Sequence, residues 1–284
     1  MYRTQLCLGL IGLPGLSPAE EVRLFRQIGF EGFFAGWSSG CTHIPALRKA
    51  ADETGMLFQS LHAPFGHMAD LWKGGEHLQD AVDELTGCLR DCHDNGVGIM
   101  VAHAFIGFED HTPTEMGLSL MEPIVREAEK LGVKIAFENT EGEEYLAALM
   151  EHFRGSKHVG FCLDTGHEIC YNYSKDMLSL YGDRLIATHL NDNLGIRDFS
   201  GQITWIDDLH LLPFDGVADW HGIAARLNHH HFSGPLTFEL TPVSKPGRHE
   251  NDAYGRMSPE DYVTAIYNRA CRVATLMQRQ KNAQ

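Results

Sequence analysis

Short apolar segments alternate with longer amphipathic segments along the whole chain, and this alternation occurs eight times. The short segments have the length of buried strands, and the longer ones carry apolar residues at helical spacing. Strands that alternate with helices are typical of a parallel sheet with helical crossovers. The predicted strands are 6–11, 32–35, 57–61, 99–102, 135–137, 159–163, 185–188 and 236–238. Eight such units predict an α/β fold, a (β/α)8 TIM barrel, and we expect a single domain over residues 1–284.

Capping signals mark where the predicted helices begin and end. Ser17-Pro18-Ala19-Glu20 and Thr112-Pro113-Thr114-Glu115 each offer a capping hydroxyl, a proline at the first helical position and a glutamate three residues after the cap. Glycines that follow helical stretches are expected to take positive φ and to end them. These glycines are Gly29, Gly55, Gly96, Gly132 and Gly182.

Three predicted strand-to-helix loops are longer than barrel closure requires, namely 64–77, 191–219 and 241–257. Long loops on the catalytic rim of a barrel often cover a substrate, although they can also be passive or contact another subunit. They carry the aromatic residues Trp72, Trp205, Phe214 and Tyr254. We therefore expect lids with apolar undersides.

Net charge and cysteine content narrow the range of partners. A net charge of −15 repels phosphodiester backbones, so we expect no nucleic-acid partner. Seven scattered cysteines without a Cys-x-x-Cys pair predict reduced thiols and a cytoplasmic location. The apolar start is too short and glycine-rich for a signal peptide or a membrane span. His229-His230-His231 precedes the last strand at the opposite face, so we expect a solvated turn there.

Four acid or imidazole groups end four successive predicted strands: Glu138, Asp164, His189 and Glu239. The carboxyl ends of barrel strands converge on one face, where barrel active sites lie. Three carboxylates brought together repel one another unless a cation neutralises them. Each residue alone could be a helix cap or a loop anchor. The set as a whole predicts a divalent metal site.

The segments around these residues resemble a known superfamily. Phe137-Glu138-Asn139-Thr140, Cys162-Leu163-Asp164-Thr165-Gly166-His167, Thr188-His189-Leu190-Asn191-Asp192 and Phe238-Glu239-Leu240 are similar to motifs of the xylose-isomerase-like TIM barrels. That superfamily contains ketose 3-epimerases, hydroxypyruvate isomerases, inosose dehydratases and zinc apurinic-site endonucleases. The resemblance extends over essentially the whole chain.

The resemblance to the sugar-acting members implies a divalent-metal-dependent isomerase or epimerase that works through an enediolate on a ketose or keto-sugar. One ion (Mn2+, Mg2+, Co2+ or Zn2+) would be held by Glu138, Asp164, His189 and Glu239, and no thiolate is expected among the ligands. Glu138 and Glu239 lie on opposite strands and would act as the acid and base. The expected substrate-binding residues are His62, His103, His167, His210, Glu144 and Arg197.

The endonuclease resemblance implies a larger site with three zinc ions on nine ligands. The chain has a residue for every one: His62, His103, Glu138, Asp164, His167, His189, Asp208, His210 and Glu239. Rim charge favours the sugar enzyme, because duplex binding needs many cationic contacts. The rim loops contain Asp192, Asp198, Asp207, Asp208 and Asp215 against Arg197, Lys245 and Arg248.

The same set of residues is compatible with two further functions. A dehydratase or lyase would use the same enediolate chemistry to expel a β-hydroxyl, and a barrel of this kind could also lack catalytic activity. No phosphate loop follows the last two strands, which favours an unphosphorylated sugar or polyol. Rim loops that contact another subunit would be compatible with a homo-oligomer.

Overall fold

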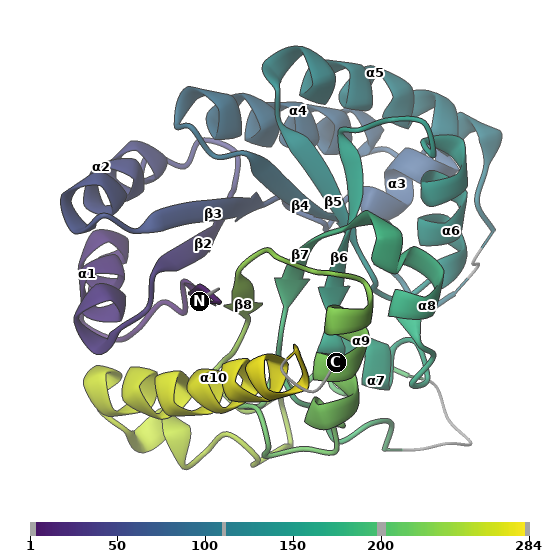
Figure 1. The fold of residues 1–284 in the computed structure, drawn as a ribbon. Coiled ribbons are helices and arrows are strands. Elements are labelled where there is room, and N and C mark those ends of the chain that lie inside the picture. The colour runs from purple at the N-terminus through teal and green to yellow at the C-terminus, as the bar shows by residue number, and fades with distance from the viewer. Residues whose placement is uncertain (1–3, 110–111, 198–202, 282–284) are drawn as a thin grey trace.

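A computed structural model describes residues 4–109, 112–197 and 203–281 and confirms the predicted (β/α)8 TIM barrel (Figure 1). Its strands are β1 (Leu6–Gly9), β2 (Gly32–Gly36), β3 (Leu57–His62), β4 (Ile99–His103), β5 (Lys134–Glu138), β6 (Val159–Asp164), β7 (Leu185–His189) and β8 (Leu236–Phe238). The α-helices are α1 (Pro18–Ile28), α2 (Ile44–Thr54), α3 (Met68–Lys73), α4 (Leu78–Asp94), α5 (Glu115–Leu131), α6 (Glu143–His152), α7 (Thr165–Cys170), α8 (Met177–Tyr181), α9 (Trp220–His229) and α10 (Pro259–Lys281). Two short 3-10 helices are η1 (Gly182–Arg184) and η2 (Tyr254–Arg256).

The strands form one parallel sheet in the order β7-β6-β5-β4-β3-β2-β1-β8. The barrel closes between β7 and β8 without a regular ladder. An isolated parallel bridge joins Leu190 to Phe238, and the Thr237 amide donates to Thr188 Oγ1 at 3.1 Å. Long α10 packs against α9 and α1, so it completes the ring of helices beside this seam.

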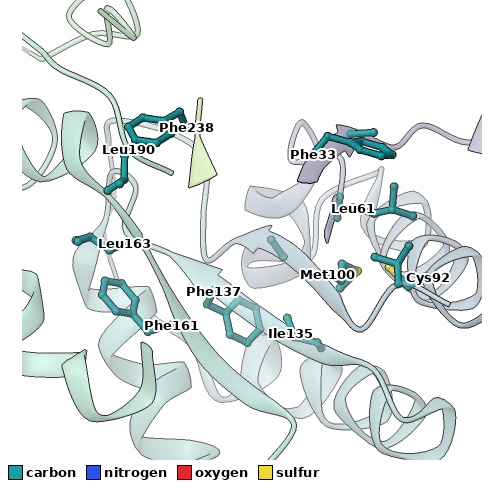
Figure 2. Packing of buried hydrophobic residues seen from close by; sticks show 14 of the residues in the cluster. Phe33, Leu61, Cys92, Met100, Ile135, Phe137, Phe161, Leu163, Leu190 and Phe238 are labelled. Carbon is teal, nitrogen blue, oxygen red and sulfur yellow. The ribbon is translucent and has the colours of Figure 1, made fainter. Parts of the chain in front are cut away.

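Alternating side chains divide the core into two layers. Small residues point into the barrel and form a separate interior cluster of Val101, Ala136, Cys162 and Ala187. Large residues point outward against the helices, as Figure 2 shows for Phe33, Leu61, Met100, Ile135, Phe137, Phe161, Leu163 and Phe238. Because successive strand residues alternate in direction, the residue two positions after an interior one also faces the barrel axis. His103, Glu138, Asp164 and His189 occupy that position.

All eight strand predictions are confirmed, with small differences at their ends. Strands β3 to β7 each extend one residue further than predicted, so that the predicted site residue is itself the last strand residue. Strand β1 ends two residues earlier, at Gly9. The buried carboxylate of Glu21 explains this, because it accepts the amides of Ile11, Gly12 and Leu13 and draws the chain away from the sheet.

Two predicted helix signals differ from the structure. Ser17 caps α1 in a complete capping box, as predicted, but α5 is capped by Thr114 and not by Thr112. The Thr114 hydroxyl accepts the Gly117 amide and donates to the Trp72 carbonyl, which fixes it in place. Gly29, Gly55, Gly96 and Gly132 have positive φ, whereas Gly182 has a φ of −58°. It is glycine because the His230 ring lies 2.4 Å from where a Cβ would be.

The long loops are more structured than predicted. Loop 64–77 contains α3, and its Trp72 is fully buried in the core, where Nε1 donates to the Ala104 carbonyl at 2.8 Å. Trp205 is half exposed at the barrel mouth. None of the helices in the described ranges combines the length and hydropathy needed to cross a bilayer, and all seven cysteines are free thiols.

Candidate metal centre at the carboxyl ends of the strands

Glu138, the last residue of β5, lies at the centre of the predicted cluster and is fully buried. Its Oε1 is 3.0 Å from His189 Nδ1 and 3.7 Å from His167 Nδ1. Its Oε2 is 3.3 Å from His62 Nε2 and 3.5 Å from His103 Nε2. One carboxylate therefore contacts four imidazoles, so it could serve as a ligand to a metal ion held at the cluster.

Glu239 contacts the same nitrogen from another side. Its Oε2 is 3.0 Å from His189 Nδ1, and its side chain is 25% exposed, whereas that of Glu138 is 0% exposed. Glu239 also lines the pocket at the barrel mouth. The two carboxylates thus share a partner but differ in access: only Glu239 of the pair lines the pocket.

Asp164 is both a site residue and a structural one. Its Oδ1 accepts the His167 amide at 2.7 Å as the N-cap of α7, and its Oδ2 accepts Asn191 Nδ2 at 2.7 Å. Its backbone pairs with the side chain of Asn139 in both directions. Asn139 comes one residue after Glu138 and Asn191 two residues after His189, just beyond the ends of their strands. This position in the sequence could have identified both asparagines as neighbours of the site.

A third part of the cluster comes from the loop after β7. His210 Nε2 lies 2.8 Å from Asp208 Oδ2, and His167 Nε2 lies 3.6 Å from Asp208 Oδ1. Lys245 Nζ is 3.6 Å from the same carboxylate. His210 has a φ of +48°, which a residue with a side chain rarely adopts and which is often found at functional sites.

Aromatic rings hold three of the imidazoles in place. Phe34 stacks on His189 with ring centroids 4.5 Å apart, and Phe65 stacks on His103 at 4.2 Å. Tyr171 stacks on His167 at 4.9 Å. These rings were not predicted from the sequence, because an aromatic residue in an apolar strand or loop carries no signal of what it contacts.

Burial and neighbouring charges shift the pKa values of the cluster. Burial raises the pKa of Asp164 to about 7. Burial would also raise the pKa of Glu239, but His189 lowers it to about 2. Conversely, burial would lower the pKa of His189, whereas Glu239 and Glu138 raise it well above its ordinary value. Without a cation, protons on the cluster therefore neutralise part of its negative charge.

Several nitrogen and oxygen atoms of the cluster are buried but have no hydrogen-bond partner, which is what a metal centre without its ion would show. Buried atoms without a hydrogen-bond partner include His103 Nδ1, His167 Nδ1, His189 Nε2 and Asp208 Oδ1. Such atoms are costly unless something unseen binds them. The cluster includes three sets of imidazole and carboxylate ligand atoms that lie within 4.8 Å of one another: His62 with His103 and Glu138, His62 with His189 and Glu239, and His167 with Asp208 and His210. Imidazole and carboxylate donors suit zinc, manganese or cobalt.

Cys162 is a further neighbour that the sequence did not assign to the site. It forms a compact group with Glu138 and His189. Burial raises the pKa of its thiol well above the ordinary value, so it is neutral in the metal-free protein. Its place in the interior layer with Ala136 and Ala187 makes it a packing residue beneath the cluster.

A pocket of about 540 Å3 opens beside the cluster. Its lining combines His62, His210 and Glu239 with Phe65, Trp205 and Lys245. This volume is typical of a site for a small molecule. This combination of polar groups and aromatic rings suits a hydroxylated substrate.

Two predicted substrate-binding residues lie away from the cluster. Glu144 is exposed in the first turn of α6 and lines a second pocket, of about 480 Å3, with Tyr171 and Tyr173. Arg197 is exposed on the loop after β7, and its amide donates to Asp207 Oδ1 at 3.4 Å.

The prediction that five aspartates make the rim of the barrel acidic differs from the structure, because most of these aspartates are buried or paired. Asp192 is buried and accepts the amides of Phe214 and Ala218 and the Trp220 indole. Asp207 and Asp208 are also buried, Asp215 pairs with Arg269, and Asp198 lies outside the described residues. These carboxylates mostly hold the loop together, so they give little outward field.

Comparison with known proteins places the chain in a family. Residues 22–257 match the family described as Xylose isomerase-like TIM barrel. The uncharacterized protein y4fM of Sinorhizobium fredii (strain NBRC 101917 / NGR234) is 33% identical over 275 residues, which cover 84% of this chain and 85% of that protein. L-ribulose 3-epimerase superposes with a TM-score of 0.73 at 14% identity, over 99% of this chain and 98% of its own. The IOLI protein, solved with a binding zinc atom, gives 0.68 at 17% identity, over 95% and 98%. The structural matches establish the fold, and the sequence match establishes that the chain belongs to the xylose isomerase-like TIM barrel family.

Proposed function

We propose that this protein is a divalent-metal-dependent enzyme that isomerises or epimerises a ketose or keto-sugar. The proposal rests mainly on the two carboxylates that contact His189 Nδ1: Glu138 is fully buried at the centre of the cluster, and Glu239 lines a pocket of about 540 Å3. The family and the sugar epimerase among the structural neighbours support the substrate class. The substrate would be a sugar that carries a carbonyl group beside a hydroxyl-bearing carbon.

We assign the metal to Glu138, Asp164, His189 and Glu239. A bound ion would supply Lewis-acid polarisation of the substrate carbonyl. Glu239 would take the proton from the carbon beside that carbonyl, since its side chain reaches the pocket. His62 and His210, which also line the pocket, would hydrogen-bond substrate oxygens, while Phe65 and Trp205 would exclude water.

The two reactions make different demands on Glu138. Isomerisation moves a proton between adjacent carbons of the enediolate on one face, so one base is enough. Epimerisation returns the proton from the opposite face and needs a second donor, which here would be Glu138. Because Glu138 is fully buried, we place isomerisation ahead of epimerisation for this chain.

Glu239→Gln tests the proposed base. The amide oxygen can still ligate but the group cannot accept a proton, so exchange of the substrate's α-proton with D2O should fall about 10²- to 10⁴-fold. The assay is proton NMR with L-ribulose, D-fructose and D-psicose in the presence of Mn2+, Mg2+, Co2+ or Zn2+. Exposed Glu151→Gln on α6 is the matched control and should exchange like the wild type.

Undiminished exchange in Glu239→Gln would remove Glu239 from the mechanism. A wild-type protein that instead releases water from the sugar, forming a dehydrated product in the same spectra, would establish a lyase.

Zinc-dependent cleavage of a phosphodiester is the second candidate, and the three donor sets favour it specifically. Nine predicted ligands, among them Asp208 and His210, form one contiguous cluster. The net charge of −15 opposes duplex binding. Elemental analysis is made on His77→Ala, which lacks a potential zinc ligand outside the central cluster. Close to three zinc ions per chain, together with incision of an abasic duplex, would reverse the ranking; about one ion and no incision would support the sugar enzyme.

A further inference from the structure

A second group of potential metal donors lies on the connection between β3 and α4, outside the central cluster. His67 directly precedes α3 and His77 directly precedes α4, so α3 lies between the two histidines in the sequence. Their rings stack with centroids 4.8 Å apart at an interplanar angle of 22°. The stack brings together the starts of two helices.

Carboxylates on the first turns of α4 face this pair. Asp80 Oδ2 lies 2.8 Å from His77 Nδ1, and Glu84 Oε2 lies 3.2 Å from His67 Nδ1. His77, Asp80 and Glu84 are three or four residues apart, so they share one face of the helix. One ligand atom each from His67, His77 and Asp80 lies within 4.8 Å of the others.

The contact with Glu84 gives His67 the arrangement of a metal-ligating histidine. Such a histidine usually donates one ring N–H to a carboxylate, which orients the ring and leaves the other nitrogen for the ion. Glu84 is 19% exposed and contacts Nδ1, so Nε2 of His67 is the nitrogen that remains. Two imidazoles and a carboxylate, without a thiolate, suit zinc and its neighbours in the first transition series.

We propose that His67, His77 and Asp80 bind a zinc-class divalent ion, with Glu84 orienting His67. Glu76, whose Oε1 is 3.4 Å from His77 Nε2, adds further negative charge beside the site. Nearby Lys73 lies over the Phe105 ring at 5.3 Å and interacts there. This inference is independent of the function proposed above.

The bound ion would fix the connection that reaches the central cluster. Phe65, two residues before His67, lines the main pocket, stacks on His103 and meets the edge of His62 with centroids 5.9 Å apart. An ion held by His67 and His77 ties both ends of α3 to α4. It would therefore restrict the position of Phe65 over the pocket.

Zinc binding to the full-length chain tests the proposal. Metal-free wild type, His77→Ala and Asp80→Asn are each titrated with Zn2+, and bound zinc is counted after equilibrium dialysis. The central cluster is the same in all three proteins, so each variant should bind one equivalent fewer than the wild type. Glu84→Gln should weaken that equivalent about 10- to 100-fold.

His249→Ala is the matched control. His249 is an exposed histidine with Asp252 three residues later, its Nδ1 2.9 Å from Asp252 Oδ2, as in the His77 and Asp80 pair. It should retain the wild-type stoichiometry. Equal zinc content in wild type, His77→Ala and Asp80→Asn, with circular dichroism showing that all are folded, would overturn the proposal.

Hydrogen exchange gives the readout for the connection. Zinc should slow amide exchange over residues 64–77 in the wild type, and this slowing should be lost in His77→Ala. Slowing of the same size in both proteins would mean that zinc at the central cluster restricts this connection. It would overturn the proposal that an ion held by His67, His77 and Asp80 does so.

Discussion

Gly9 is glycine because the Phe34 ring occupies the space of a side chain at that position. A Cβ on Gly9 would lie 2.5 Å from Phe34 Cε1. Phe34 in turn stacks on His189, whose ring is fully buried between Glu138 and Glu239. A residue at the first strand of the barrel thus sets the orientation of an imidazole on the seventh.

Gly9→Ala should therefore destabilise the fold by about 1–3 kcal/mol through overpacking, and should weaken metal binding by displacing Phe34 from His189. Gly36→Ala at the end of β2 is the control, because nothing lies within 4 Å of a Cβ there. Urea denaturation and zinc titration of both variants provide the measurements. If both variants keep wild-type stability and affinity, Phe34 does not position His189.

The residues that the sequence identified and those it missed differ in a physical way. Glu138, Asp164, His189 and Glu239 were identifiable because a charged group that ends an apolar strand is conspicuous. Phe34 and Phe65 were not, because their contacts depend on strand register and loop path. Exposed Glu144 and Arg197 rested on the resemblance alone. Periodicity and strand ends therefore predict donors, and only the fold reveals what holds them.

Helix α7 carries His167, and an ion pair ties this helix to α9. Arg226 Nη2 is 2.6 Å from Glu168 Oε1, and its Nη1 donates to Glu168 Oε2 at 3.0 Å. The same guanidinium reaches Asp176, which caps α8, at 2.7 Å. The Glu168 side chain is 8% exposed, so Arg226 neutralises a buried charge next to the candidate site.

Arg226→Met should cost roughly 2–3 kcal/mol, somewhat less than a fully buried pair, because it leaves Glu168 uncompensated. Adding Glu168→Gln should recover part of the loss. Arg23→Met, which removes an exposed partner of Glu53, should cost clearly less, because solvent screens an exposed pair. Chemical denaturation of the wild type and these three variants measures the differences. Equal losses for Arg226→Met and Arg23→Met would show that the pair on α7 contributes no more than a surface pair.

Element boundaries illustrate the limits of local sequence signals. The cap of α1 was predictable because Ser17 and Glu20 satisfy each other locally. The cap of α5 was not, since the choice of Thr114 over Thr112 depends on the Trp72 carbonyl, which comes from another segment. The prediction of positive φ at Gly182 was wrong, because its φ is −58° and the His230 ring, which comes from another segment, occupies the space of a side chain there.

At the scale of the whole molecule, the barrel concentrates charge at one end of its axis. The metal-free cluster holds protons there: burial raises the pKa of Asp164 to about 7, and Asp208 raises the pKa of His210 to about 9 despite burial. An acid whose pKa is raised in the fold favours the folded state at low pH, and this contribution is lost as pH rises through about 7. A metal ion must displace these protons, so its affinity should fall as the solution is acidified.

Metal binding should therefore stabilise the fold more at pH 7.5 than at pH 5. An ion that binds only the folded chain adds about 2.7 kcal/mol at a hundredfold excess over its dissociation constant, which should raise the melting temperature by roughly 5 °C. At pH 5 the chelated protein keeps the Asp164 proton and the ion competes poorly, so the difference between loaded and chelated protein should shrink. Thermal melts with excess Zn2+ or Mn2+ and with EDTA at both pH values test this, with His77→Ala included so that zinc at the β3–α4 connection does not contribute. Identical melting temperatures in all four conditions would mean that Glu138, Asp164, His189 and Glu239 do not bind metal, and the proposed function would fail with them.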